Sequence, residues 1–304
     1  MNEPEKETCA YYLNVGSDSL SDDVKKQEKR FFSLSVASGK GGVGKTLTIV
    51  NLAMAVSHMG LKVLILDGDL GLANVDVVLG LQSQYHIQDV IAGFVSLDEI
   101  ILQGPSGINI IPSGSGISEL QSLTYTQKQI LFQKILHLDM DFDFLLIDTG
   151  AGIGDNVLHL NSISDSRLIV TTPEPHAITD AYALIKVLAE KEGLNDFDLM
   201  VNMASSRREA ENVANRIIST CSSFLKINVN YKGFVPLDKN VPKLVMQQNA
   251  ASNLAFNTLA SQAWGQIASD YACLFNQAES YTKESAFWRN YLCANPGSHT
   301  QRTS

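Results

Sequence analysis

A glycine-rich stretch, SGKGGVGKT, lies between an apolar run and a helical pattern and carries two lysines. It matches the phosphate-binding pattern G-x-x-x-x-G-K-[ST]. Glycines allow the backbone to curl so that several N–H groups face one anion, and the helix that follows adds its positive N-terminal end. Lys45 would reach the β- and γ-phosphates, and Thr46 would offer its hydroxyl to Mg²⁺. The predicted nucleotide-binding residues of this loop are Gly39, Lys40, Gly41, Gly42, Val43, Gly44, Lys45, Thr46 and Leu47.

Two acidic motifs accompany the glycine-rich stretch. The segment LILDGDLG places Asp67 and Asp69 at the end of an apolar run, and DFLLIDTG ends another in Asp148. Ligands bind at the carboxyl ends of the strands in an open α/β sheet, so these carboxylates are expected beside the phosphates. Asp148 would hold Mg²⁺ through water. The first pair would orient Mg²⁺ or the attacking water, and helix capping by one of them is the alternative. The predicted metal-binding residues are Thr46, Asp67 and Asp148.

The elements that must position these residues alternate along the chain. Short runs that are almost continuously apolar suit the strands of a parallel sheet covered on both faces. Helical patterns lie between them, and repeated strand–helix units imply right-handed crossovers. The sequence therefore predicts an α/β fold with a doubly wound, mostly parallel sheet and helices on both faces. Strands are expected over 31–38, 62–67, 108–113, 143–148, 167–173, 197–203 and 231–236, and helices over 45–58, 125–138, 176–191 and 253–277.

Composition divides the chain of 304 residues into three parts. Residues 1–31 form a polar arm, residues 32–277 the nucleotide-binding domain, and residues 278–304 a polar tail with a short amphipathic segment. The acidic N-terminus is unlike a secretory signal, and no apolar run approaches the roughly 18 residues of a membrane span. The four cysteines show no metal-binding spacing. These features predict a cytoplasmic protein with free thiols.

The extra lysine extends the loop to K-G-G-x-x-G-K-[ST], beginning at Lys40. This pattern resembles the deviant Walker A, or MinD/ParA, class of P-loop ATPases, and the resemblance covers residues 32–275. In that family the extra lysine reaches across a dimer to the partner's nucleotide. The resemblance therefore implies that Lys40 joins two subunits through ATP, and that Asp69 positions the attacking water. The implied catalytic residues are Lys40, Lys45 and Asp69, and the implied activity is slow, regulatory ATP hydrolysis.

Two later strand ends resemble the adenine-contacting segments of the same family. VNMAS ends an apolar run at Asn202, whose amide offers both a donor and an acceptor, as an adenine edge requires. VPLDKNVPK ends another run at Pro236, with Asp238 following. The guanine-reading pattern N-K-x-D does not occur. The expected ligands are therefore ATP and Mg²⁺, with Asn202, Pro236 and Asp238 near the base.

The two acidic segments, DGDLGLANVDVVLGL and DTGAGIGDNVL, look most like the FlhG/FleN branch of the family. Proteins of that branch limit flagellar number and influence flagellar placement. The resemblance implies protein partners such as an FlhF-like GTPase or a flagellar transcriptional activator, in addition to the homodimer. The arm of this chain, which contains LSDDVKKQEKRF, lacks the motif by which some members activate the GTPase.

The C-terminal segment TKESAFWRNYLC places four apolar side chains on one helical side, but only Lys283 and Arg289 supply positive charge. Membrane insertion usually needs both an apolar face and basic residues. Packing of this segment on the body or on a protein partner, and peripheral attachment to the membrane or a cell pole, are both left open.

Three other functions are alternatives. A ParA-type DNA-partitioning ATPase needs a basic surface, and the net charge of −9 argues against direct binding of nucleic acid. A MinD-type division-site regulator shares the same loop. A metabolic P-loop enzyme would need a substrate pocket, and no motif marks one.

Overall fold

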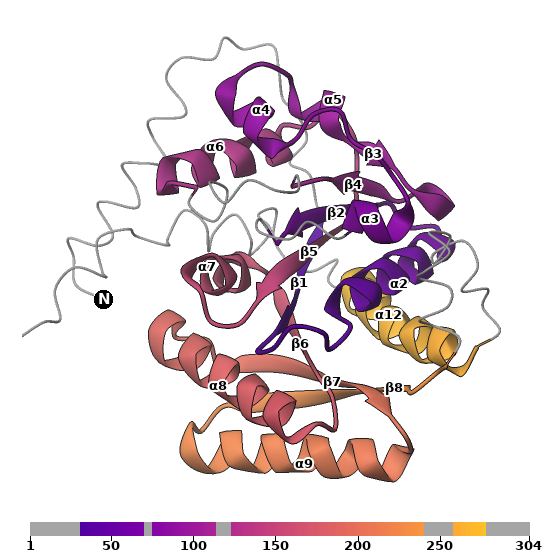
Figure 1. Cartoon of the computed structure of the whole chain (residues 1–304), viewed down its shortest axis with the longest axis vertical. Coiled ribbons are helices and arrows are strands. Elements are labelled where there is room, and N and C mark those ends of the chain that lie inside the picture. The colour runs from indigo at the N-terminus through magenta and orange to yellow at the C-terminus, as the bar shows by residue number, and fades with distance from the viewer. Residues whose placement is uncertain (1–30, 70–74, 114–122, 240–257, 278–304) are drawn as a thin grey trace, which may run out of the picture.

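The computed structural model describes residues 31–69, 75–113, 123–239 and 258–277. Within them, an eight-stranded sheet has the order β3-β4-β2-β5-β1-β6-β7-β8 (Figure 1). Every neighbouring pair is parallel except β3 with β4. The predicted doubly wound, mostly parallel sheet is therefore confirmed. The strands are β1 (Phe32–Ser38), β2 (Val63–Gly68), β3 (Leu102–Gln103), β4 (Asn109–Ile111), β5 (Phe144–Ala151), β6 (Ser166–Thr171), β7 (Asp196–Ala204) and β8 (Asn228–Pro236).

Helices cover both faces of this sheet (Figure 1). One hydrophobic cluster joins the sheet to α2, α3 and α12, and two others join its opposite face to α4–α7 and to α7–α9. Burial on both faces explains why the strands read as continuous apolar runs. The helices are α2 (Lys45–His58), α3 (Val75–Leu79), α4 (Ile87–Ala92), α5 (Leu97–Ile100), α6 (Tyr125–Leu136), α7 (Asp155–Ile163), α8 (Pro175–Glu192), α9 (Arg207–Phe224) and α12 (Leu259–Gln277), with a 3₁₀ turn, η1 (Pro105–Gly107).

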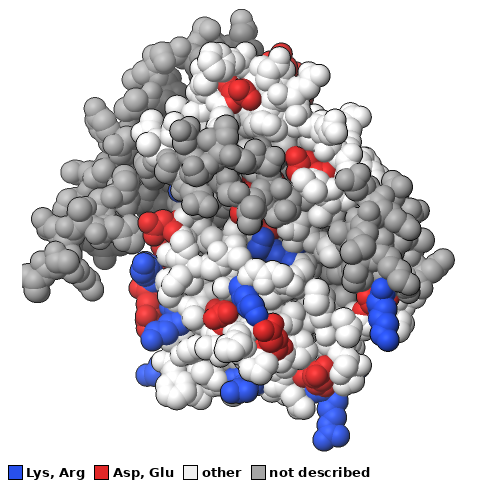
Figure 2. Space-filling view, viewed as in Figure 1, with Lys and Arg blue, Asp and Glu red and all other residues white. Residues whose placement is uncertain are grey.

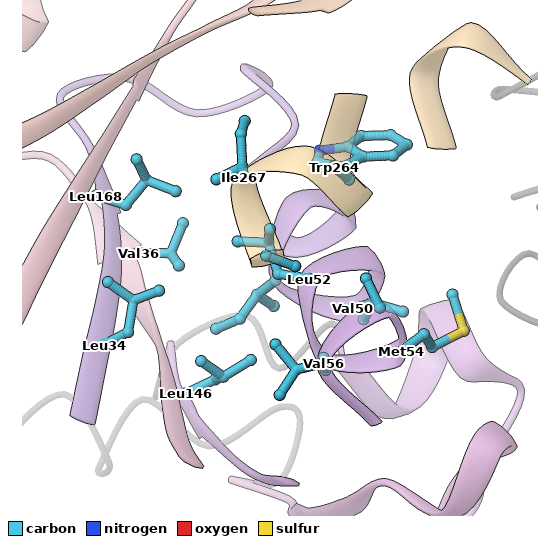
Figure 3. Packing of buried hydrophobic residues seen from close by; sticks show 14 of the residues in the cluster. Leu34, Val36, Val50, Leu52, Met54, Val56, Leu146, Leu168, Trp264 and Ile267 are labelled. Carbon is cyan, nitrogen blue, oxygen red and sulfur yellow. The ribbon is translucent and has the colours of Figure 1, made fainter. Parts of the chain in front are cut away.

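Helix α2 is packed between the sheet and α12. Figure 3 shows Leu34 and Leu146 pointing from the strands toward Leu52 and Val56 of α2. From α12, Trp264 lies across the same cluster with 2% of its surface exposed. Because both sides of α2 are buried, its first turn, which follows the glycine-rich loop, has a fixed position relative to β1 and β5.

A buried polar cluster fastens α12 to the sheet. The hydroxyl of Tyr271 donates to a carboxylate oxygen of Asp198 on β7 at 2.7 Å, and the hydroxyl of Ser166 on β6 donates to the same oxygen at 3.0 Å. The ammonium of Lys232 on β8 lies 3.5 Å from the other oxygen and 5.2 Å from the centre of the Tyr271 ring. Four separate elements thus share one buried carboxylate.

The structure adds elements that the sequence analysis did not predict: β3 and helices α3, α4, α5, α7 and α9. The last strand begins at Asn228 rather than 231, because polar asparagines interrupt the apolar run there. The helix predicted over 253–277 is observed from Leu259, and residues 253–257 lie outside the described residues, as do the amphipathic tail segment and nearly all of the predicted arm. Phe31, the last residue of that arm, is buried against Phe142. Among the described residues, every helix is too short or too polar to span a lipid bilayer.

We predict that Tyr271→Phe lowers the free energy of unfolding by about 2 kcal/mol, because it removes a buried hydrogen bond to a charged group. Urea denaturation measures the change. The control is Tyr85→Phe, which alters a tyrosine that is 45% exposed and should change stability by less than about 0.5 kcal/mol. Equal effects of the two substitutions would contradict the role given to the Asp198 cluster.

Candidate functional site

The order of the central strands brings the predicted site residues together. In the register of β5 with its two neighbours, Asp148 lies opposite Val36 of β1 and opposite Asp67 of β2. All three strands are parallel, so their carboxyl ends open at one edge of the sheet. The glycine-rich loop leaves β1 at this edge, beside both carboxylates.

Residues 39–44 form a curled loop between β1 and α2. Gly42 and Gly44 have φ angles of 81° and 87°, in the left-handed region that favours glycine. Gly39 is required by space, because a Cβ there would lie 2.1 Å from the backbone oxygen of Asp180 on α8. A Cβ at Gly41 would meet nothing within 4 Å. The loop is thus tightly packed behind and open in front, as a phosphate cradle requires.

Lys45 begins α2 and points at the acidic end of β5. Its ammonium lies 2.7 Å from one oxygen of Asp148, and the two side chains are only 8% and 1% exposed. Burial raises the pKa of Asp148, while the charge of Lys45 and the hydrogen bond from its ammonium act in the opposite direction. Lys45 is therefore a buried cation whose only charged neighbour within ion-pair distance in the described structure is this carboxylate. Leu47 lies half-buried in the same first turn of the helix.

The carboxylate of Asp148 also offers an unused acceptor. Its second oxygen is buried and has no hydrogen-bond partner, a condition that costs free energy unless a ligand occupies it. An acceptor oxygen beside the hydroxyl of Thr46 suits Mg²⁺ or a water molecule that Mg²⁺ carries. These two residues fit the predicted metal.

Asp67 is engaged differently. Its two carboxylate oxygens accept backbone N–H groups from Asp69, at 3.1 Å, and from Val75, at 3.2 Å. This side chain is 1% exposed. It therefore bridges the two ends of the segment that follows β2, which gives it a structural role here; its predicted contact with the metal stays a prediction.

Asp69, the first residue after β2, lies near the end of β5. A Cβ added to Gly150 would come within 3.6 Å of an oxygen of the Asp69 carboxylate. The backbone after β5 is held in turn to β1, because Gly152 donates to the carbonyl of Ser38 at 2.9 Å. The structure thus brings Asp69 to the predicted site. Its role in positioning water stays a prediction.

Lys40 lies in a different environment from Lys45. Its ammonium is 2.6 Å from a carboxylate oxygen of Glu174, the residue before α8, and the two side chains are 36% and 52% exposed. This contact lowers the pKa of Glu174. The sequence analysis did not identify Glu174. The sequence does contain this carboxylate at the end of the apolar run RLIVTTPEP, which could have marked it as a site residue. Only the pairing of β6 with β1, however, places that strand end beside the glycine-rich loop.

The predicted base-binding residues lie on the other side of the loop. Asn202 is 3% exposed, and its side-chain amide donates to the carbonyl of Val43 at 2.8 Å. Pro236 pairs with Ala204 across β7 and β8, and Asp238 follows it by two residues. The strand order therefore brings these residues to one edge, and their contact with adenine stays a prediction.

Comparison with known proteins identifies the family. The ParA model, described as NUBPL iron-transfer P-loop NTPase, matches residues 31–272. This chain belongs to the ParA/MinD family of P-loop NTPases. The chain is 40% identical over 235 residues to the antiactivator FleN of Pseudomonas aeruginosa, a match that covers 77% of this chain and 84% of FleN. It is 32% identical over 251 residues to the flagellum site-determining protein YlxH of Helicobacter pylori, covering 80% and 85%.

Solved structures agree with this assignment. The MinC:MinD cell division protein complex of Aquifex aeolicus matches with a TM-score of 0.66 and 26% identity, over 80% of this chain and 96% of that chain. The septum site-determining protein MinD of Pyrococcus horikoshii, complexed with Mg-ADP, matches with a TM-score of 0.66 and 26% identity, over 80% and 97%. The predicted resemblance to the MinD/ParA class, and to its FlhG/FleN branch, is confirmed.

We predict that Lys45→Met destabilises the fold in a pH-dependent way. When the charge of Lys45 is removed, burial is no longer opposed by it, and the pKa of Asp148 rises further. Below that pKa the carboxyl is protonated and tolerated; above it, an unpaired buried charge destabilises the folded state, so stability is lost as pH rises. We expect a loss of about 3 kcal/mol near pH 8 and a smaller loss near pH 5.5, measured by urea denaturation.

The matched control is Lys40→Met, which removes an exposed ion pair and should leave the free energy of unfolding unchanged at both pH values. A loss for Lys45→Met that is the same at both pH values would show that the charge on Asp148 does not cause it.

Proposed function

We propose that this protein is an ATP-dependent dimerising switch that regulates flagellar number or placement by binding protein partners. The observation that carries the proposal is the separation of the two lysines. Lys45 is buried in its own phosphate site, whereas Lys40 lies at the surface on Glu174. A lysine that the loop presents outward is available to a nucleotide bound by a second copy of the chain.

Each residue of the site has a separate role in the proposed hydrolysis. Lys45 would exchange Asp148 for phosphate oxygens, and the carboxylate of Asp148 and the hydroxyl of Thr46 would then be the groups that hold Mg²⁺, the carboxylate through water. When bound, Mg²⁺ supplies charge neutralisation at the phosphates. Backbone N–H groups of the loop bind the remaining phosphate oxygens. Asp69 orients the attacking water, and the proposed hydrolysis is slow, as the resemblance to regulatory ATPases implies.

The same geometry couples the bound nucleotide to the conformation of the segments that follow β2 and β5. Asp69, which follows β2, lies close to Gly150 near the end of β5, and Gly152, the first residue after β5, donates a hydrogen bond to the carbonyl of Ser38, the last residue of β1. A γ-phosphate in the cradle would meet both segments. A partner that binds one arrangement more tightly than the other converts this local change into a signal.

The names of the relatives support the biological role. One is described as an antiactivator and another as flagellum site-determining, and a MinD structure contains the protein MinC. By analogy, the proposed partners are a flagellar transcriptional activator or an FlhF-like GTPase, met in the cytoplasm or at the periphery of the membrane or cell pole.

DNA partitioning is the second candidate, because plasmid partition proteins share the fold. Two observations disfavour it. The net charge is −9. On the face of the molecule that Figure 2 shows, Lys and Arg are interspersed with Asp and Glu over the described surface. A DNA gel shift with ATP at low salt would separate the two functions.

We predict that the protein is a monomer with ADP and a dimer with ATP and Mg²⁺, and that Lys40→Ala remains a monomer with ATP. The measurement is size-exclusion chromatography with light scattering. Lys186→Ala, which removes a lysine from another exposed ion pair on α8, is the control and should dimerise normally. A monomer in every nucleotide state would refute dimerisation, and a dimer of Lys40→Ala would refute the role of Lys40.

We also predict that Asp69→Ala binds ATP with unchanged affinity but hydrolyses it at least about 100-fold more slowly, because it loses the group that orients water. Its dimer should persist after ATP is added, whereas the wild-type dimer decays. Phosphate release measures the rate. Hydrolysis at the wild-type rate would remove Asp69 from the mechanism.

A further inference from the structure

The backbone around Asp69 is held by side chains from two other parts of the chain. The side-chain amide of Asn156, in the first turn of α7, donates to the carbonyl of Gly68 at 3.1 Å. The hydroxyl of Ser113, a fully buried residue, donates to the carbonyl of Asp69 at 3.4 Å. The peptide groups before and after the Cα of Asp69 are therefore both fixed from outside β2.

Gly68 is enclosed between β5 and α7. A Cβ there would lie 2.7 Å from the side chain of Leu160 on α7 and 2.9 Å from the backbone oxygen of Asp148 on β5. Glycine permits such a close approach because it has no side chain. Asn156 precedes Leu160 by four residues, so the two side chains lie on the same face of the helix. The face of α7 that packs on Gly68 thus also carries the amide that bonds it.

The chain segment that contains Asn156 also reaches the carboxylate of Asp69. A Cβ added to Gly150 would come within 3.6 Å of an oxygen of that carboxylate. Six positions later, Asn156 bonds the peptide group that precedes Asp69. Residues 150–156 therefore contact Asp69 both at its side chain and through its backbone, and a displacement of this segment would change both contacts together.

We infer that Asn156 is a positioning residue for Asp69: its bond to Gly68 fixes the backbone that directs the Asp69 carboxylate toward the end of β5. The inference rests on the proposed role of Asp69 in hydrolysis. Asn156 acts on the rate of hydrolysis and leaves the affinity for ATP unchanged, because Lys45 and the glycine-rich loop are held by other contacts, including the pair with Asp148.

The experiment measures ATP affinity and kcat for wild type, Asn156→Leu and Asn156→Asp. Leucine keeps most of the side-chain volume without a donor, and aspartate keeps the shape of asparagine but replaces the donor with an acceptor. We expect kcat to fall about tenfold in both variants at unchanged affinity, as the loss of one hydrogen bond implies. A wild-type kcat, or an equal loss of affinity, would overturn the inference.

A double-mutant cycle tests whether Asn156 acts through Asp69. In the Asp69→Ala background, Asn156→Leu should lower the single-turnover rate no further, because the group that it positions is absent. A further tenfold loss would overturn the inference. If Asp69→Ala alone hydrolyses ATP at the wild-type rate, the proposed role of Asp69 fails instead, and hydrogen exchange then decides whether Asn156 positions this backbone.

Hydrogen exchange measures the positioning without nucleotide. The backbone N–H of Asp69 donates to the carboxylate of Asp67 at 3.1 Å. In Asn156→Leu this N–H should exchange about tenfold faster than in the wild type, because the adjoining peptide group is released from α7. An unchanged exchange rate would overturn the inference.

Asn161→Leu is the matched control, since it places the same substitution on the same helix. The amide of Asn161 also donates to a backbone carbonyl, that of Val157, at 2.7 Å, and its oxygen accepts from Ser35 on β1. This variant should lose thermal stability and keep the kcat of its folded fraction. A fall in kcat equal to that of Asn156→Leu would show that any defect in α7 has this effect, which would overturn the inference.

Discussion

The buried ion pair between Lys45 and Asp148 is the contact on which the site depends. It joins the first residue of α2 to the middle of β5 at 2.7 Å, in surroundings where neither side chain is more than 8% exposed. A buried charge without a partner is strongly destabilising. The pair therefore requires α2 and β5 to keep their relative position. Packing of α2 between the sheet and α12 meets that requirement from the apolar side.

The phosphate loop is positioned by contacts that come from distant parts of the chain. Asp180 of α8 lies against Gly39, and Asn202 of β7 is bonded to Val43. The loop is therefore supported from behind while its front stays open at Gly41. A loop fixed in this way binds an anion without a further ordering cost, which favours affinity.

The two lysines of the loop show how one short motif can serve two purposes. Lys45 is withdrawn into a buried pair, and Lys40 is held at the surface by Glu174. Exposed ion pairs contribute little to stability and exchange partners readily. The buried pair thus fixes Lys45 beside Asp148, whereas Lys40 can leave Glu174 at little cost, which is what the proposed dimerising switch needs.

The sequence by itself determined the types of element and the chemistry of the loop, because glycine spacing and apolar periodicity are local properties. Those patterns yielded the parallel sheet, the extent of α2, and the gathering of Asp67, Asp69 and Asp148. Only the tertiary structure decided which residues support the loop. Asn202 contacts Val43 across 159 positions, and Lys40 contacts Glu174 across 134. Such contacts depend on the order β5-β1-β6-β7. Strand order follows from how the crossovers pack on the whole sheet, a property that no local pattern encodes.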